Sequence, residues 1–272
     1  MRYLDTSRYR KTKTGGLYLS YNDIENITID IINDYDKTLL TKPHAIEYDD
    51  FLEAYLGVDV DYQHIYTSNS SDVILGCTLF SKQYLDVFDK ESMTKKSYLY
   101  TPITVVLDKS LIEGDRKIQD TITSLHEGGH VYMHKEQFME MQGQYTLNVS
   151  TGKICCRRVD IEKINTDKFK PSNDEMWREW QANIFAVTLA LPKMSLDISV
   201  RDIFDKYGIR SQLVMDDNYS TKELAEYIIP SELKKIYNMS KESIKYRLIK
   251  LGYYITKEQY IQKNKYIQMS LF

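Results

Sequence analysis

One short motif, HEGGH at residues 126–130, constrains this chain more than any other feature. Two histidines four residues apart lie on the same face of a helix, so both imidazoles can reach one metal ion. Glu127 lies near that face, where it can contact a water on the metal without being a ligand. Histidine is scarce, five in all, and three of the five fall between residues 126 and 134. From this composition the motif arises by chance in roughly one chain in a hundred, so we predict a metal site.

The residues around the motif favour a buried helix. Small or apolar residues recur there at helical spacing: Ile118, Ile122, Leu125 and Gly129. Asp115 is the candidate N-cap of this helix. His134 lies about 12 Å along the axis from His126, at 1.5 Å per residue, which is too far for His126, His130 and His134 to bind one ion. We therefore expect His134 to line the pocket or to support the structure.

A catalytic zinc site needs a third protein ligand and one position open to water. The best candidate is Glu179, in a second predicted helix over residues 175–192, which starts with a capping box of Ser172 and Glu175 and ends at Pro192. The other residues on its face are small or polar: Ala182, Asn183, Ala186 and Ala190.

That small face, with Gly128 and Gly129 on the other helix, would let the two helices approach closely. Glu179 would then meet the histidines, and Asn183, one turn on, would hydrogen bond to a ligand. The simpler alternative for Glu179 is a solvated helix charge. Two histidines and a glutamate are the ligand set of one large class of zinc peptidases.

With these residues in view, HEGGH followed by EWQANIFAVTLALP resembles the ImmA/IrrE family of metallo-endopeptidases. The family pattern is roughly HExGH, a variable segment, and then ExxANxFAxxLLMP. The matching positions are Glu179, Ala182, Asn183, Phe185, Ala186 and Pro192. The similarity extends from about Pro43 to Gly252. Gly128 departs from the pattern, since the family usually has an apolar residue there, and the extra glycine costs the helix about 1 kcal/mol.

The resemblance implies an α+β, zincin-like metallopeptidase core, a small mixed sheet packed on the motif helix, with helical N-terminal and C-terminal elements. It implies that His126, His130 and Glu179 bind Zn²⁺, or Mn²⁺ in its place. Glu127 would take the proton of the attacking water and return it to the leaving amine. Similar proteins cleave a helix-turn-helix repressor of mobile-element or stress genes, so the implied partner is such a repressor.

We expect three segments: a basic flexible tail over residues 1–19, the metallopeptidase domain over 20–195, and a helical C-terminal extension over 196–272. Helices are predicted from Ser20, with Asp23 completing its capping box, and over 48–56, ending at Gly57. Strands are predicted over 58–62, 73–80, 84–88 and 101–107, with the middle two as a hairpin, and a second hairpin pairs 145–149 with 153–159. One edge strand would hold the substrate chain in extended form.

Composition adds expectations about location. The net charge is −3, and no apolar run approaches the length of a membrane helix. The N-terminal residues are basic and polar, without the apolar region of a signal peptide. We therefore expect a cytoplasmic protein, with no membrane partner and with its three cysteines reduced. For Cys155 and Cys156, buried inert thiols are the simpler interpretation, and a thiolate that blocks the metal or senses redox state is the alternative.

The C-terminal residues 231–272 suggest a rival function. They carry nine Lys or Arg residues against three Glu. Residues 233–248 match a helix-turn-helix, with a turn at Asn238 and an N-cap at Ser240. A DNA-binding regulator could contact a duplex through Lys241, Lys245 and Arg247. The same spacing also describes two packed helices, in a catalytically inactive binding module for example.

Overall fold

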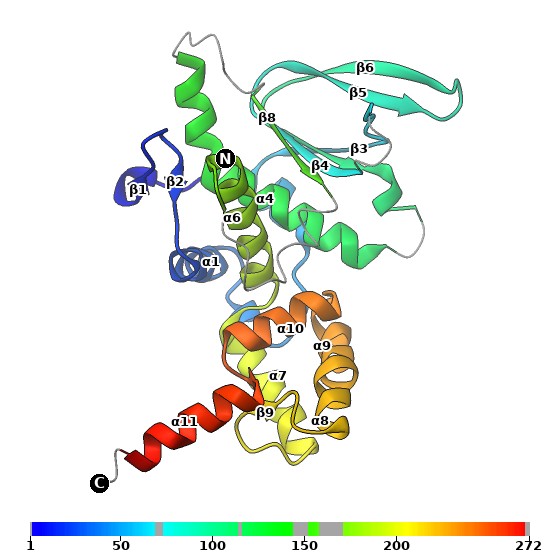
Figure 1. The fold of residues 1–272 in the computed structure, drawn as a ribbon. Coiled ribbons are helices and arrows are strands. Elements are labelled where there is room, and N and C mark those ends of the chain that lie inside the picture. The colour runs from blue at the N-terminus through cyan, green and yellow to red at the C-terminus, as the bar shows by residue number, and fades with distance from the viewer. Residues whose placement is uncertain (1, 69–72, 114–115, 144–151, 158–170, 270–272) are drawn as a thin grey trace. The chain divides into compact units, whose positions relative to one another are not determined.

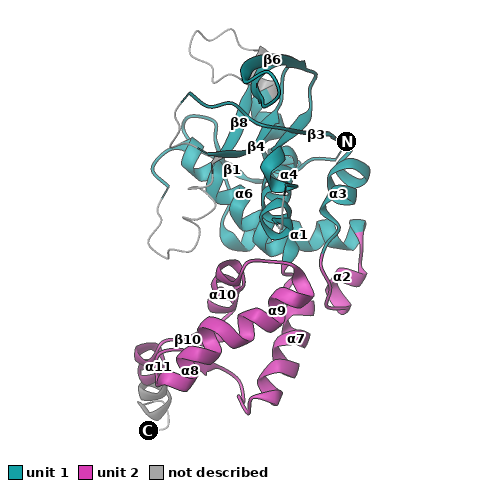
Figure 2. Cartoon of the chain, turned by 90° about the vertical axis from the view of Figure 1, so that its right-hand side faces the viewer, with its two compact units in different colours: residues 1–35, 46–190 teal, residues 36–45, 191–272 magenta. Residues whose placement is uncertain are grey.

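The computed structural model describes residues 2–68, 73–113, 116–143, 152–157 and 171–269. The fold is α+β, as predicted, and the chain divides into two compact units (Figures 1 and 2). Unit 1 comprises residues 1–35 and 46–190, and unit 2 comprises 36–45 and 191–272. The sequence analysis placed a boundary at 195, and the contacts divide the chain after residue 190. The assignment of residues 36–45 to unit 2 was not foreseen, because those residues pack on a helix far along the chain.

Among the described residues of unit 1, the long helices are α4 (Lys117–Gly143), α6 (Asp174–Ala190) and α1 (Tyr21–Tyr35). The helix α4 carries the HEGGH motif, and α6 packs against it and against α1. The shorter helical elements of this unit are η1 (Thr6–Arg8), α3 (Tyr48–Asp50), η2 (Phe51–Leu56) and η3 (Lys109–Leu111).

A mixed four-stranded sheet packs on α4. Its strands, in spatial order, are β3 (Asp59–Gln63), β7 (Thr104–Asp108), β4 (Ile74–Leu79) and β8 (Lys153–Arg157). The pair β3–β7 is parallel, whereas β7–β4 and β4–β8 are antiparallel. All of β7 is buried, because α4 covers one face of the sheet and the other face carries an apolar cluster that includes Leu79, Leu85 and Val106.

The predicted hairpin of strands 73–80 and 84–88 is wrong. Strand β4 pairs within the four-stranded sheet, whereas β5 (Gln83–Asp89) pairs with β6 (Thr94–Tyr100) in a separate antiparallel sheet. The polar sequence of β6, TKKSYLY, hid it from a search for apolar alternation, and its residues are exposed or half-buried. Strands β3 and β7 confirm the predictions over 58–62 and 101–107. The predicted strand 145–149 lies outside the described residues.

The prediction of a flexible tail over residues 1–19 is wrong as well. Leu4, Leu17 and Leu19 are buried, and the Leu4 N–H donates to the Tyr132 carbonyl at 2.8 Å. A short antiparallel pair, β1 (Arg10–Lys11) with β2 (Leu17–Tyr18), turns the segment back on itself. Three leucines spaced through a basic segment were enough to fix it to the core.

In unit 1, two of the three predicted helix ends that fall on described residues agree with the structure. Ser20 and Asp23 cap each other's backbone N–H at the start of α1, and Gly57 ends η2 in the left-handed conformation (φ 70°). At the start of α6 the predicted cap Ser172 is wrong, because Asn173 Oδ1 accepts the Met176 N–H at 2.8 Å. Asp115 lies outside the described residues.

Unit 2 is mostly helical. Its elements are α2 (Thr38–Thr41), α7 (Lys193–Lys206), β9 (Leu213–Val214), α8 (Tyr219–Glu223), η5 (Leu224–Ile228), α9 (Ile229–Tyr237), α10 (Lys241–Lys250), β10 (Tyr254–Ile255) and α11 (Lys257–Met269). The predicted turn is confirmed: Asn238 is left-handed, and the Ser240 side chain caps α10 by accepting the Ser243 N–H. No single helix in the described part of the chain is long and apolar enough to cross a membrane, and α6 and α7 pass that test only when taken together.

The expectation of three reduced cysteines is wrong for two of them. Cys77 on β4 and Cys155 on β8 are direct cross-strand partners with Cα atoms 4.2 Å apart, and they form a disulfide. Both side chains face the apolar cluster on the side of the sheet away from α4. Cys156, the next residue, is buried and is not in a disulfide.

The two motif glycines serve different contacts. A Cβ on Gly129 would lie 3.0 Å from the Phe185 ring, which shows how closely α4 and α6 approach, as predicted. A Cβ on Gly128 would instead lie 3.0–3.1 Å from Leu52 and Phe51 of η2. The prediction that both glycines face the second helix is thus correct for Gly129 and wrong for Gly128.

Phe185 fills the junction of these elements, so we predict that Phe185→Ala lowers the free energy of unfolding by about 3–5 kcal/mol. The ring is fully buried and lies 6.4 Å from the Phe51 ring and 6.1 Å from the Tyr132 ring, centroid to centroid. Chemical denaturation measures the effect. The control Tyr84→Ala removes a ring that is 65% exposed and should cost at most about 1 kcal/mol. Equal losses in the two variants would contradict this packing.

Candidate metal centre

The motif side chains lie on the buried side of α4. His126, Glu127, His130 and His134 are all 0% exposed. Helix α6 brings Glu179 to them: its two carboxylate oxygens lie 3.3 Å from His126 Nε2 and 3.4 Å from His130 Nε2. The two Nε2 atoms are 2.9 Å apart. Ligands about 2.0–2.1 Å from a tetrahedral zinc are about 3.3–3.4 Å from one another, so these three groups have nearly that spacing.

A hydrogen-bond chain determines which nitrogen of His130 carries the proton. Gln181 Nε2 donates to the Leu17 carbonyl at 2.8 Å, so Gln181 Oε1 must accept from His134 Nε2, 2.9 Å away. Neutral His134 then accepts at Nδ1, and His130 Nδ1, 3.0 Å away, must donate to it. His130 Nε2 is left with its lone pair, directed at Glu179 and His126.

His126 has the same arrangement. Its Nδ1 lies 2.6 Å from Asn183 Oδ1, an acceptor, so the ring proton sits on Nδ1 and the lone pair on Nε2. Two imidazole lone pairs therefore face each other across 2.9 Å beside a carboxylate. Such an arrangement is repulsive unless a cation, either a proton or a metal ion, lies among the three groups.

The pKa values reflect this sharing of charge. Burial opposes ionisation of Glu179, but the two histidines outweigh burial and hold the pKa of the carboxyl well below its usual range. Burial also opposes protonation of His126, yet the Cys156 sulfur and Glu179 together raise its pKa well above the usual value. Burial lowers the pKa of His130 to about 4. Of the two histidines, His126 is therefore the one whose surroundings favour the protonated form.

Glu127 is held separately from the other acidic group. Thr78 Oγ1 on β4 donates to its Oε2, while Oε1 is buried and has no side-chain hydrogen-bond partner in the part of the chain that the structure describes. A Cβ on Gly76 would lie 2.6 Å from Oε1, so only glycine lets β4 pass this close to the carboxylate. Burial raises the pKa of Glu127 to about 7, although His126 and Thr78 act against the rise. A carboxyl with that pKa can take up and release a proton near neutral pH.

A sulfur atom completes the cluster. The ligand atoms of His126, Cys156 and Glu179 all lie within 4.8 Å of one another, and the Cys156 thiol hydrogen bonds to His126. Burial raises the pKa of this thiol to about 12. From the sequence, buried inert thiols were the preferred interpretation of Cys155 and Cys156, and a thiolate that blocks the metal was the alternative. The strand pairing of β8 brings Cys156, and not Cys155, to α4.

Sequence reasoning named His134 and Asn183 as supporting residues and missed Gln181. The structure puts His134 between His130 and Gln181, and Asn183 against His126. A signal for Gln181 was present: it is a polar residue at the start of the run QANIFAVTLA, all of which is buried. A buried amide in such a helix needs partners, and here they are His134 and the Leu17 carbonyl.

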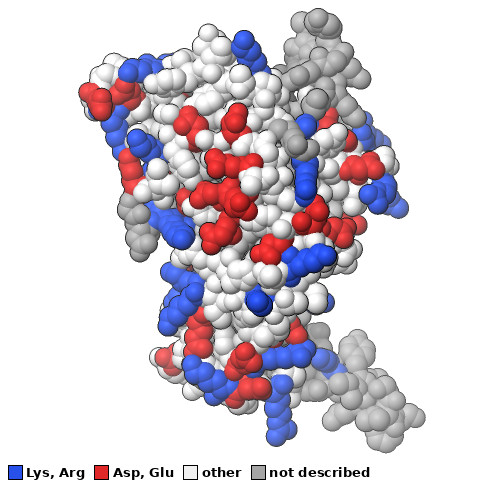
Figure 3. All heavy atoms as spheres, turned by 180° about the vertical axis from the view of Figure 1, so that it is seen from behind, with Lys and Arg blue, Asp and Glu red and all other residues white. Residues whose placement is uncertain are grey.

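Two of the three basic residues proposed to contact DNA instead make contacts within unit 2. Arg247 is fully buried, and its Nε donates to the Leu191 carbonyl at 3.1 Å. Lys245 is half-buried and pairs with Glu226. In Figure 3 basic and acidic side chains are interspersed over the face in view, with acidic ones gathered near its middle.

Comparison with known proteins does not assign the chain to a family. No protein-family model matches the chain, and no curated protein matches it.

We predict that Gln181→Leu destabilises the protein by about 1–3 kcal/mol, because it leaves the His134 Nε2–H and the Leu17 carbonyl buried without partners. Nitrogen NMR of the imidazole rings should show Nδ1–H on His130 in the wild type and loss of that single form in the variant. The control Gln212→Leu removes a half-buried amide that donates to the Gly252 carbonyl in unit 2, and it should leave the imidazole spectrum unchanged. An unchanged His130 spectrum in Gln181→Leu would contradict the proton assignment.

Proposed function

We propose that this chain is a metal-dependent endopeptidase whose centre is formed by His126, His130 and Glu179, with Glu127 as the proton-transfer group. One observation carries the proposal. Two imidazole Nε2 atoms and the Glu179 carboxylate converge in a buried site, and a second buried carboxyl group, Glu127, lies on the same helix as the two histidines. A purely structural histidine cluster has no need of that second carboxylate.

The donor set suits zinc. Two neutral imidazole nitrogens and one carboxylate oxygen are the three protein ligands of one class of catalytic zinc sites, and Mn²⁺ accepts the same donors. Glu179 Oε2 is buried, lies 3.3 Å from His126 Nε2 and has no closer hydrogen-bond partner among the described residues, so it is placed to accept a cation. Asn183 and His134 would hold the two rings with Nε2 toward the ion, as such partners do at other sites.

A bound divalent cation would polarise a peptide carbonyl and acidify a water molecule. The chain's own contribution is then proton transfer at Glu127 Oε1, the oxygen that Thr78 leaves unused. Burial keeps the proton affinity of this carboxyl near that of neutral solution, so it can take a proton from water and pass it to the leaving amine. Thr78 and Gly76 fix its orientation from β4.

The narrower proposals rest on the resemblance of HEGGH and EWQANIFAVTLALP to the ImmA/IrrE family. They are a zincin-like domain, a cytoplasmic regulatory protease, and a helix-turn-helix repressor of mobile-element or stress genes as its substrate. The rival function, duplex binding through α10, would need Lys241, Lys245 and Arg247 at the surface, and Arg247 is buried.

We predict about one zinc per chain in purified protein, and its loss in Glu179→Ala, because two imidazoles alone hold the ion weakly. Glu127→Gln should keep the metal, since Glu127 is not a ligand. Elemental analysis after dialysis measures both, with circular dichroism as the check on folding. Absence of metal from the wild type after incubation with zinc or manganese would contradict the proposal, as would full metal content in a folded Glu179→Ala.

We predict that the metal-loaded wild type cleaves internal bonds in a peptide library prepared from digested cell protein, whereas Glu127→Gln does not. The variant keeps the size of the side chain and removes its ability to accept a proton. Mass spectrometry of new peptide termini measures cleavage and reports the preferred sequence. Equal numbers of new termini in the two samples would exclude peptidase activity at this site. Candidate repressors can then be searched for the preferred sequence.

A further inference from the structure

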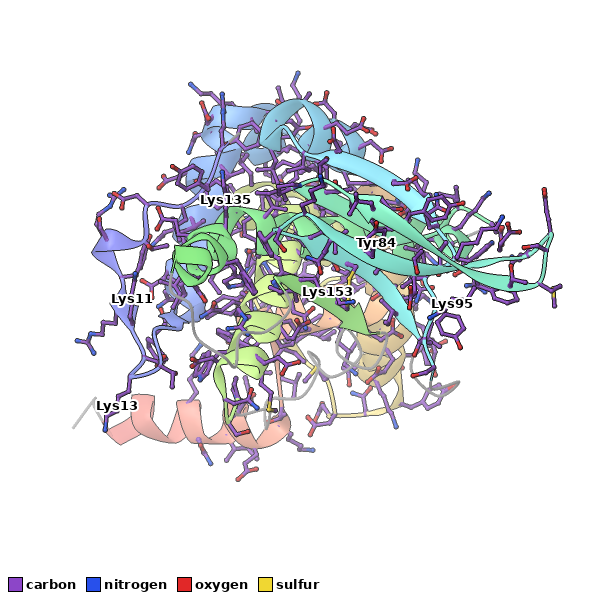
Figure 4. All side chains as sticks on the ribbon, turned by 90° about the horizontal axis from the view of Figure 1, so that it is seen from above. Lys11, Lys13, Tyr84, Lys95, Lys135 and Lys153 are labelled. Atoms are coloured by element: carbon purple, nitrogen blue, oxygen red, sulfur yellow. A yellow bond between two sulfur atoms is a disulfide. The ribbon has the colours of Figure 1, made fainter. Side chains whose placement is uncertain are left out.

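Solvent reaches the proposed metal centre on the side of Glu179. The two motif histidines and Glu127 are 0% exposed, whereas the Glu179 side chain is 13% exposed and the preceding residue of α6, Arg178, is half-buried. Figure 4 looks down on this part of unit 1, where Lys135 marks the C-terminal half of α4 and α6 packs beside that helix. A substrate that reaches the ligands from this side passes Arg178.

Arg178 carries a charge without a counter-ion. Its Nε is buried and has no hydrogen-bond partner among the described residues, and no carboxylate of those residues forms an ion pair with it. Burial lowers the pKa of the guanidinium, and Asp174, Glu175 and Glu179 act on it only at longer range. Asp174 instead accepts a hydrogen bond from the Thr14 hydroxyl. A partly buried, unpaired guanidinium is costly for the fold and is well suited to bind an anion.

A second group without partners lies on α4. Gln137 is 4% exposed, and neither its amide nitrogen nor its amide oxygen has a hydrogen-bond partner in the described part of the chain. It follows His130 on the same helix face, about 10 Å along the axis at 1.5 Å per residue. The ring of the next residue, Phe138, stacks on Phe80, and its centroid lies 5.5 Å from Arg178 Cζ. Gln137 and Arg178 therefore lie at the same end of the contact between α4 and α6.

This pair of side chains suits a carboxylate close to the metal ligands. Guanidinium and amide N–H groups donate to carboxylate oxygens, and the amide oxygen of Gln137 can accept a backbone N–H of a peptide. Burial lowers the pKa values of His130 and His134, and the Arg178 charge acts in the same direction, so the guanidinium is near both imidazoles. An extended peptide advances about 3.3 Å per residue. A side chain within about three residues of the bond at the metal can thus reach Gln137.

We infer that Arg178 and Gln137 form a subsite for an acidic side chain of the substrate, within about three residues of the scissile bond. This inference rests on the proposed function and adds a substrate preference to it. Arg178 supplies the opposite charge, and Gln137 orients the bound segment. Neither residue is among the proposed metal ligands or the proton-transfer group, so substitution should change which peptides are cleaved and leave metal binding intact.

The peptide library tests the preference. We expect the bonds cleaved by the metal-loaded wild type to have Asp or Glu within three residues more often than uncleaved bonds do, and Arg178→Gln to lose that enrichment. Arg178→Lys keeps the charge and should retain part of it. In the matched control, Arg201→Gln, an arginine of unit 2 that pairs with Asp197 is removed, and the enrichment should persist.

Peptide binding separates recognition from cleavage. Glu127→Gln is titrated with a synthetic peptide that spans the most frequent cleavage site, and with the same peptide carrying an amide in place of its acid. We expect the acidic peptide to bind about 10- to 100-fold more tightly, as for a hydrogen bond to a charged group, and Arg178→Gln in this background to abolish the difference. Gln137→Leu should also weaken binding of the acidic peptide, without lowering the thermal midpoint, because it replaces an amide that has no partners.

Three outcomes would overturn the subsite and leave the peptidase standing: cleavage without acidic enrichment, enrichment that survives in a folded, metal-loaded Arg178→Gln, or equal affinity for the two peptides. If Arg178→Gln does not fold, unchanged binding in Gln137→Leu would overturn it. Cleavage confined to the last residues of each peptide would identify the carboxylate as a chain terminus, against both the subsite and an endopeptidase. No cleavage by the wild type would overturn the peptidase, and the subsite with it.

Discussion

The structure depends on two imidazole nitrogens, His126 Nε2 and His130 Nε2, that face each other across 2.9 Å in a buried site. Each is aimed by a partner on α6: Asn183 orients His126, and Gln181, through His134, orients His130. The N-terminal segment takes part too, since the Leu17 carbonyl fixes Gln181. Elements separated by more than a hundred residues in the sequence thus determine the direction of one nitrogen lone pair.

Because the site is buried, each of its polar groups requires a hydrogen-bond partner or an opposite charge. In a low-dielectric interior an unpaired lone pair or carboxylate is costly, and an opposite charge nearby is strongly stabilising. A proton on His126, next to the Glu179 carboxylate, would meet this requirement. A divalent cation in the same place would satisfy three donors at once, and its binding energy would add to the stability of the fold.

The same strands that orient Glu127 also close the site. Strand β4 passes over Glu127 at Gly76 and holds it through Thr78, and β8 on its outer edge brings Cys156 to His126. Two neighbouring residues of β8 have different surroundings, because successive side chains of a strand point to opposite faces of the sheet. Cys155 faces the apolar cluster and pairs with Cys77, while Cys156 faces α4.

Short sequence patterns determined the features that depend on neighbouring residues, namely helix faces, helix caps and turns. The motif HEGGH and the small face around Glu179 were enough to name four side chains that the fold brings together, because helix periodicity decides which residues share a face. Capping at Ser20 and the left-handed turns at Gly57 and Asn238 followed from single residues in the same way.

Only the tertiary structure decided what depends on contacts between distant segments. The sequence alone could not reveal that β4 pairs with β7 and β8, that leucines in a basic tail are buried, or that Arg247 points inward. Nor could it separate Cys155 from Cys156, since their roles depend on which face of β8 meets α4. Strand pairing and burial depend on packing over the whole unit, so they cannot be predicted from the residues next to them in the sequence.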